Sequence, residues 1–256
     1  MEIKFCGYKW LTQQPWGDVH ENNPTWWQDP SCVDVTEGED ILRLQTKYNT
    51  RVNGSGVKSI IGAGLVSSIQ TFGYGDFEAE VMLPKGTGLF PAFWLWGANS
   101  WPPEIDIFEG WSRKSGLYTS KCVPYYSLAS NIWWGKNNKP ENLKSKSHMV
   151  WNRFDQCYNH FKLEWRPDRI EIFYNGNSVR KVTDNKILSW YSNIQMRVIF
   201  NNGLEKLEDY TNDSVMLVKN FKYTPYQNEN MKGDEPNDFY QVTSVPEKQI
   251  DDLLMT

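Results

Sequence analysis

The sequence predicts an all-β protein built as an antiparallel sandwich of two sheets. Polar and apolar residues alternate with a period of two in many short segments, which is typical of half-buried strands. Clusters of glycine, proline and asparagine separate these segments and indicate turns. No long stretch shows helical periodicity, so a sandwich is favoured over a mixed α/β fold.

The expected strands follow one another from residue 41 to residue 223. They are Ile41–Thr46, Gly64–Gln70, Phe77–Leu83, Ala92–Trp96, Phe161–Trp165, Arg169–Tyr174, Gln195–Phe200 and Val215–Tyr223. Asn175 and Gly176 come directly after the sixth of these strands and mark a hairpin turn. Loops are expected at 73–75, 84–88 and 134–140, where turn residues gather.

One domain is expected over residues 1–226. The remaining range, 227–256, is polar and acidic and is expected to be a flexible or docking tail, with a short amphipathic stretch at 247–254. Cys6, Cys32, Cys122 and Cys157 have no CxxC spacing, so they are expected to be free thiols or to form at most two disulfides. No metal site is expected from them.

The composition narrows the class of protein. The net charge of −4 comes without a basic excess, so no nucleic-acid partner is expected. No run approaches the roughly 18 apolar residues of a membrane span, and the start, MEIKFCGYKW, has no visible signal peptide. Aromatic residues make up 15% of the chain, including 13 Trp. They indicate a large aromatic core, a surface on which sugar rings stack, or both.

The segment WPPEIDIFEGW, residues 101–111, combines three carboxylates with apolar neighbours. In a regular strand Glu104 and Asp106 share one face, whereas Glu109 lies on the other. A β-bulge, which adds one residue, would return Glu109 to the first face. Ile105 would then face the core, and Ile107 or Phe108 would absorb the bulge.

Three acids on one face repel one another, so their titrations must be coupled. Glycoside hydrolysis with retention uses such a set: an ionised carboxylate as nucleophile and a protonated carboxyl as acid, about 5–5.5 Å apart. A solvated acidic strand or a calcium loop would carry similar residues, and the segment alone leaves these alternatives open.

The surrounding sequence resembles glycoside hydrolase family 16, which includes laminarinases, agarases, porphyranases and carrageenases. The resemblance rests on GYGDFEAEVMLPKGTGLFPAFWLWG (73–97) followed by WPPEIDIFE. The residue inserted before the last Glu is typical of the bulged branch of that family. A further match, FKLEWRPDRI (161–170) continuing to Gly176, resembles the family's downstream hairpin.

The resemblance implies a β-jelly roll with a cleft along its concave face and no cofactor. It implies that Glu104 is the nucleophile, Glu109 the general acid/base and Asp106 the assisting carboxylate. Phe90 and Trp101 match aromatic positions of the cleft. The three other aromatic candidates for substrate binding are Trp94 and Trp111, each of which could face the cleft or the core, and Trp133.

Several positions depart from the family pattern. Trp133 stands where bulged-branch members usually carry a histidine, and His20, His148 and His160 are expected on the surface. Glu80 replaces a common arginine and is expected to alter the cleft. Lys219 replaces an aspartate that binds structural calcium in many members, so no metal site is predicted.

The function that this resemblance implies is an endo-acting retaining hydrolase of a β-linked polysaccharide, either a β-1,3-glucan or a β-linked galactan. Arg113 and Lys114 could contact a sulfated galactan. A non-catalytic carbohydrate-binding protein and a transglycosylase are the alternatives. The chain is expected to be a monomer or part of a larger assembly such as a phage particle, and to act outside cells. Because no signal peptide is visible, a trimmed chain or association with a virion would explain its export.

Overall fold

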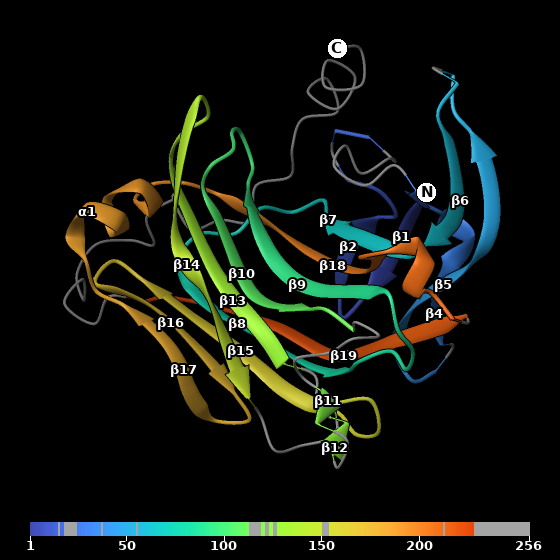
Figure 1. Cartoon of the computed structure of the whole chain (residues 1–256). Coiled ribbons are helices and arrows are strands. Elements are labelled where there is room, and N and C mark those ends of the chain that lie inside the picture. Colours follow the sequence, from blue (N-terminus) through green and yellow to red (C-terminus); the bar gives the residue numbers. More distant parts are fainter. Residues whose placement is uncertain are drawn as a thin grey trace.

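Two large β-sheets form the protein, packed face to face (Figure 1). A computed structural model describes residues 1–14, 16–17, 25–36, 38–54, 56–112, 119–120, 123–124, 127–149, 154–211 and 213–227. Arg113, Lys114, His20, Cys122 and the tail from residue 228 onward lie outside the described residues, so the expectations for them stay untested.

The first sheet has eight strands. Their order is β1 (Glu2–Phe5), β2 (Tyr8–Leu11), β7 (Leu65–Ser68), β18 (Met196–Leu204), β9 (Leu89–Gly97), β10 (Glu104–Gly110), β13 (Ser127–Lys136) and β14 (Lys139–Met149). All neighbours in this sheet are antiparallel.

The second sheet has nine strands. Its main path is β17 (Asn177–Val182), β16 (Arg169–Tyr174), β15 (Asn159–Arg166), β8 (Gly75–Met82), β19 (Ser214–Pro225), β5 (Ile41–Val52), β6 (Lys58–Ala63) and β3 (Trp26–Gln28), and β4 (Val33–Thr36) pairs with β5. β3 and β6 are parallel, a departure from the expected purely antiparallel pattern.

Short elements connect these sheets. β11 (Thr119–Ser120) pairs with β12 (Val123–Pro124), and the helical elements are α1 (Asn185–Leu188) and the 3-10 turns Pro30–Cys32, Ser189–Tyr191 and Leu207–Asp209. Within the described ranges, no helix is long and apolar enough to cross a membrane. The all-β prediction is therefore confirmed, and the architecture is a jelly-roll sandwich.

Each strand expected from the sequence is present, but the sequence missed others. The prediction of a loop over 134–140 was wrong, because β13 continues through Lys136 and β14 begins at Lys139. β14 lies at the edge of its sheet and reads KPENLKSKSHM, which lacks alternating apolar residues. Charged, lysine-rich sequences are common on edge strands because they discourage pairing with other chains.

Aromatic rings fill much of the space between the sheets. Strands β8 and β15 alternate between buried and half-buried residues, so one face of each turns to the core. Phe93 and Phe200 stack at 4.3 Å between ring centroids, and Phe108 from β10 meets Phe161 from β15 at 4.5 Å. Such contacts add to the free energy of burial, and they fix β10 against the opposite sheet.

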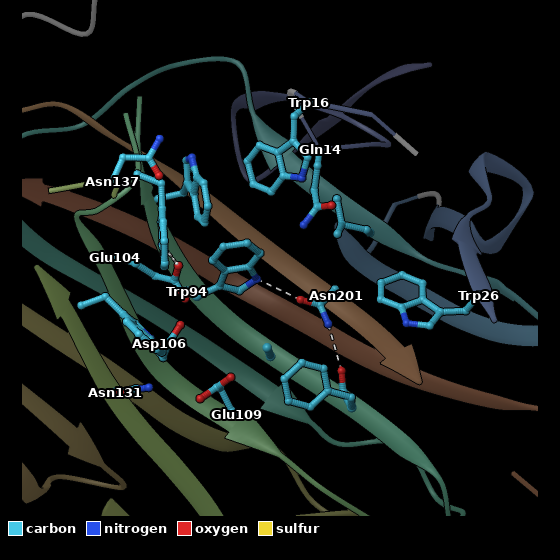
Figure 2. Close-up of a pocket in the computed structure, with 16 residues that line it drawn as sticks. Gln14, Trp16, Trp26, Trp94, Glu104, Asp106, Glu109, Asn131, Asn137 and Asn201 are labelled. Carbon is cyan, nitrogen blue, oxygen red and sulfur yellow. Dashed lines mark hydrogen bonds between the residues drawn. The ribbon is translucent and has the colours of Figure 1, made fainter. Parts of the chain in front are cut away.

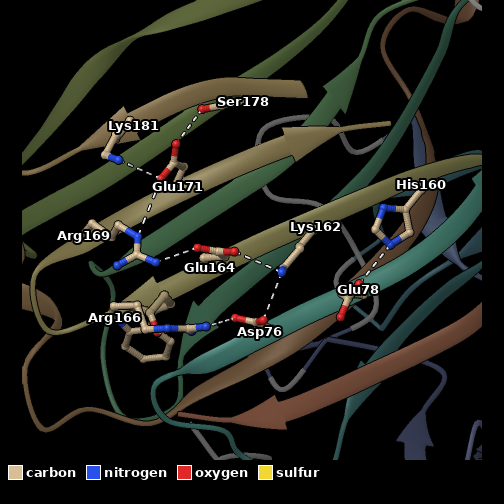
Figure 3. A network of polar contacts seen from close by, with 11 residues as sticks. Asp76, Glu78, His160, Lys162, Glu164, Arg166, Arg169, Glu171, Ser178 and Lys181 are labelled. Carbon is tan, nitrogen blue, oxygen red and sulfur yellow. Dashed lines mark hydrogen bonds and ion pairs between the residues drawn. The ribbon is translucent and has the colours of Figure 1, made fainter. Parts of the chain in front are cut away.

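The outer face of the nine-stranded sheet carries what we call the outer ion-pair network (Figure 3). Its members are Asp76, Lys162, Glu164, Arg166, Arg169, Glu171 and Lys181. Lys162 Nζ lies 3.1 Å from Asp76 and 3.0 Å from Glu164, and Arg169 Nη2 lies 2.8 Å from the other oxygen of Glu164. Each carboxylate of this network therefore has a cationic partner.

Cys6, Cys32 and Cys157 are free thiols. Burial raises the pKa of Cys6 to about 11 and that of Cys32 to about 12, so both stay protonated. In the part of the chain that the structure describes, no group of three or more His, Cys, Asp and Glu residues could hold a metal ion.

Candidate active site

A β-bulge in β10 brings the three carboxylates of the central segment onto one face. Asp106 pairs with Trp94 of β9, but Phe108 pairs with Phe93, so Ile107 is the extra residue. On the other side the register shifts between Asp106 and Glu109. Ile105, Ile107 and Phe108 are all fully buried in the core. The bulge predicted from the sequence is therefore present.

The three carboxylates line a groove of about 670 Å³ on the eight-stranded sheet. Figure 2 shows Glu104, Asp106 and Glu109 in a row along β10, with Trp94 and Asn201 beside them. We call these three acids the carboxylate cluster. Within the described residues, none of the three forms an ion pair with a lysine or arginine, unlike the acids of the outer ion-pair network.

Burial raises the pKa of Glu104 to about 7, while hydrogen bonds with Asp106 and Trp101 oppose that rise. The indole Nε1 of Trp101 donates to Glu104 Oε2 at 2.6 Å. A donor at this distance favours the ionised carboxylate. Trp101 therefore contacts a carboxylate of the cluster directly.

Asp106 is only 2% exposed. Burial raises its pKa well above the ordinary value, and the charges of Glu104 and Glu109 raise it further. Its Oδ2 atom is buried and accepts no hydrogen bond from the described residues. A side-chain hydrogen bond with Glu104 also raises the pKa of Asp106 and couples the two carboxyls.

Burial raises the pKa of Glu109 to about 8, and the charges of Glu104 and Glu205 contribute. Glu104 is therefore the easier of the two glutamates to ionise, and Glu109 is the one that keeps its proton to higher pH. Two carboxyls with separated pKa values can divide the roles of nucleophile and acid between them.

The neighbouring strands set what surrounds each acid. Glu104 lies between Trp96 of β9 and Trp133 of β13, and Asp106 lies between Trp94 and Asn131. Cross-strand neighbours of this kind share a face of the sheet. Trp133 is thus directly opposite Glu104.

Four of the five aromatic residues expected to bind substrate line the groove: Phe90, Trp94, Trp101 and Trp133. Trp94, whose direction the sequence left open, faces the groove, and its Nε1 donates to Asn201 Oδ1 at 2.9 Å. Trp111 is not among the described residues that line the groove. Its ring stacks on Phe90 at 5.6 Å between centroids and so supports that side chain.

The sequence analysis missed several groove residues, namely Gln14, Trp16, Trp26, Trp96, Asn131, Asn137 and Asn201. Trp96 could have been found, because it lies two residues from Trp94 and alternate residues of a strand share a face. Trp16 contacts Trp96 at 4.3 Å between centroids with the ring planes tilted by 35°, and Trp101 stacks on the same ring at 5.8 Å. Only the fold brings Trp16 from the N-terminal segment to this position.

Two expectations about other residues were wrong. His148 is buried rather than exposed, because its ring packs edge-on against Tyr174 and its Nε2 lies 2.9 Å from Ser130 Oγ. Glu80 does not alter the groove: it lies on the nine-stranded sheet, where Lys219 Nζ approaches it to 3.3 Å. His160 is partly exposed and contacts Glu78 at 3.1 Å.

A jelly roll with an aromatic groove and a row of coupled carboxylates defines a carbohydrate-active type of protein. The chain belongs to the glycosyl hydrolases family 16, whose family model matches residues 20–213. The family expected from the sequence is therefore confirmed.

Individual relatives include both binding proteins and enzymes. Beta-1,3-glucan-binding protein 1 of Galleria mellonella is 27% identical over 174 residues, which are 60% of this chain and 34% of that protein. A beta-glucanase of Acetivibrio thermocellus is 25% identical over 225 residues, 86% of this chain and 60% of that protein. The chain thus spans between about a third and three fifths of the length of these relatives.

Solved structures share the fold. LamAcat from Zobellia galactanivorans superposes with a TM-score of 0.67 at 18% identity, covering 85% of this chain and 91% of that one. At this level of identity the likeness supports the jelly-roll architecture alone.

Proposed function

We propose that the protein is an endo-acting retaining hydrolase of a β-linked glucan. The observation that carries this proposal is the carboxylate cluster: three coupled acids in an aromatic groove, two of them with pKa values raised to about 7 and about 8. Near neutral pH such a pair holds one ionised and one protonated carboxyl, the combination that glycoside hydrolysis requires.

In this proposal Glu104 is the nucleophile. The hydrogen bond from Trp101 Nε1 and the lower pKa favour its ionised form. Its carboxylate oxygen forms a bond to the anomeric carbon as the bond to the leaving sugar oxygen breaks, which gives a covalent glycosyl-enzyme.

Glu109 is the acid and then the base. Its raised pKa keeps a proton available for the leaving oxygen. In the second half of the reaction the ionised Glu109 takes a proton from water, and the water oxygen displaces Glu104 from the anomeric carbon. Asp106, whose raised pKa keeps it protonated, donates a hydrogen bond to the ionised Glu104 before the attack.

The relatives and the groove support a β-glucan as the substrate class. The relatives are named for β-1,3-glucan binding and for β-glucanase activity, which favours a glucan over a galactan. Phe90, Trp94 and Trp133 give the groove flat apolar surfaces, and aromatic faces stack well on pyranose rings. A polymer of this kind is found outside cells, so we expect the protein to act there.

A non-catalytic glucan-binding protein is the second candidate. The Galleria mellonella relative carries that name. The presence of all three acids in one coupled cluster opposes it, because a binding surface has no need for carboxyls that repel one another.

A reducing-end assay tests the proposal. Wild type, Glu104→Gln and the control Glu164→Gln, which changes an acid of the outer ion-pair network, are incubated with laminarin, lichenan, agarose and κ-carrageenan. We expect wild type and the control to cleave laminarin or lichenan, and Glu104→Gln to lose activity about 10³-fold or more. In a separate incubation with a glucan oligosaccharide, products longer than that oligosaccharide would indicate transglycosylation.

The hydrolase proposal is wrong if wild type cleaves none of these polymers and, in affinity electrophoresis, wild type and Glu104→Gln bind a glucan with equal affinity. The binding-protein alternative would then replace it.

A further inference from the structure

The bulge in β10 places Glu109 in the groove, so whatever holds the bulge in shape also sets the relation between Glu109 and Glu104. A bulge interrupts the regular ladder of backbone hydrogen bonds and bends the strand. Here both registers shift at the same point, against β9 and against β13. The backbone pairing of β10 with its two neighbouring strands is therefore less regular at the bulge than along the rest of the strand.

A hydroxyl from the opposite sheet reaches the inserted residue. Tyr174, the last residue of β16, donates from its hydroxyl to the carbonyl oxygen of Ile107 at 2.7 Å. The same hydroxyl lies 3.5 Å from the carbonyl oxygen of Ala129 on β13, beside the bulge. Tyr174 is 1% exposed, so water does not compete for these bonds.

The Tyr174 hydroxyl remains a donor over the working pH range. Burial raises its pKa well above the ordinary value, and the nearby charges of Glu109 and Asp106 act in the same direction. The ring belongs to the core between the sheets and its hydroxyl contacts Ile107, so Tyr174 lies on the core side of β10.

A second hydroxyl holds the other end of the cluster. Tyr191, in the turn after α1, places its hydroxyl 3.0 Å from the carbonyl oxygen of Glu104 and 2.5 Å from that of Trp133. It is buried as well. One hydroxyl can donate to only one of these oxygens at a time, yet either bond ties the start of β10 to the core.

We propose that Tyr174 and Tyr191 are positioning residues: their hydroxyls hold the backbone of β10 at the bulge and at Glu104, and thereby set the spacing between the Glu104 and Glu109 carboxyls. This inference rests on the proposed hydrolase function. The spacing matters because the retaining mechanism works at about 5–5.5 Å between carboxyls, and a misplacement of about 1 Å can reduce a rate about 10²-fold.

The experiment compares Tyr174→Phe with a matched control, Tyr223→Phe. Tyr223 of β19 is also buried, and its hydroxyl donates to the carbonyl oxygen of Tyr74, just before β8, at 3.0 Å in a partly buried position. Both variants lose one hydroxyl-to-carbonyl hydrogen bond of a buried tyrosine, but only Tyr174→Phe loses it at β10. Tyr191→Phe is an independent second variant of the same kind.

Two readouts are taken. The first is kcat and KM on the glucan that wild type cleaves. The second is amide hydrogen exchange of residues 104–110 without substrate. We expect Tyr174→Phe to lower kcat about tenfold or more with KM within about twofold, and to speed exchange of 104–110 selectively. Tyr191→Phe should change both readouts in the same direction. Tyr223→Phe should change neither the kinetic constants nor the exchange of residues 104–110.

The inference is overturned if Tyr174→Phe and Tyr191→Phe keep the kcat of Tyr223→Phe and leave exchange of residues 104–110 at the wild-type rate. If wild type cleaves no glucan, the proposed function fails, whereas hydrogen exchange still decides whether the two hydroxyls hold β10.

Discussion

The two sheets of this sandwich shift the pKa values of their glutamates in opposite directions. On the outer face of the nine-stranded sheet, burial would raise the pKa of Glu164, but hydrogen bonds from Arg169 and Lys162 lower it below the ordinary value. In the groove of the eight-stranded sheet, burial raises the pKa of Glu104 and Glu109 without such partners. Burial without a cationic partner makes the two groove carboxyls proton carriers, whereas two cationic partners keep the less buried Glu164 ionised.

The largest expected effect comes from exchanging one acid in each region. Glu109→Gln removes the proposed proton donor, so we expect kcat/KM for glucan hydrolysis to fall about 10²–10⁴-fold. Glu164→Gln alters the outer ion-pair network and should leave kcat/KM within about twofold. Steady-state kinetics of both variants checks this, and equal losses in the two would contradict the contrast between the regions.

The same pair of variants should affect stability with opposite signs. Between about pH 4.5 and the folded pKa of about 8, folded Glu109 holds a proton that the unfolded chain has lost. Stability therefore falls as the pH rises through that window, and Glu109→Gln should stabilise the protein by about 1–2 kcal/mol at pH 8.5 and little at pH 4.5.

Glu164 behaves in the other direction. Its lowered pKa contributes stability above the unfolded value, and that contribution is lost as the pH falls through the lower folded value. Because the network is partly exposed to solvent, Glu164→Gln should cost only about 0.5–1 kcal/mol at pH 7 and less near pH 3. Thermal melts of both variants across pH measure the stability of each relative to wild type. If that stability difference changes with pH in the same direction for both variants, the comparison between the two regions is wrong.

A smaller effect is expected from a neighbour of the cluster. Activity that needs ionised Glu104 and protonated Glu109 should give a bell-shaped kcat/KM profile with limbs near pH 7 and pH 8. The charge of Glu205 helps to raise the pKa of Glu109, so Glu205→Gln should move the basic limb to lower pH. The acidic limb serves as the internal control, and a shift of that limb alone would count against the assignment of Glu109 as the acid.

The sequence predicted those features that depend on local pattern. The alternation in β8 and β15 survives in the fold because one face of each packs on the core. The bulge followed from the spacing of Asp106 and Glu109, since only an inserted residue could put both on one face. The edge strand β14 escaped prediction because its lysine-rich sequence carries no periodic signal.

Contacts between distant segments could not be predicted in this way. Trp16 meets Trp96, about 80 positions later in the sequence, only because the fold brings the N-terminal segment against β9. The burial of His148 depends on Tyr174 from the other sheet. The hydroxyls of Tyr174 and Tyr191 likewise reach β10 through the core, and no local pattern marks them.

The central claim is that the carboxylate cluster hydrolyses a β-glucan through a covalent intermediate on Glu104. Proton NMR of the anomeric signals during cleavage of a β-glucan oligosaccharide tests it most directly. The account predicts that the first product carries the β-configuration at its new reducing end and only later mutarotates. A first product with the α-configuration would mean a single displacement by water, and the assignment of Glu104 as nucleophile would be wrong.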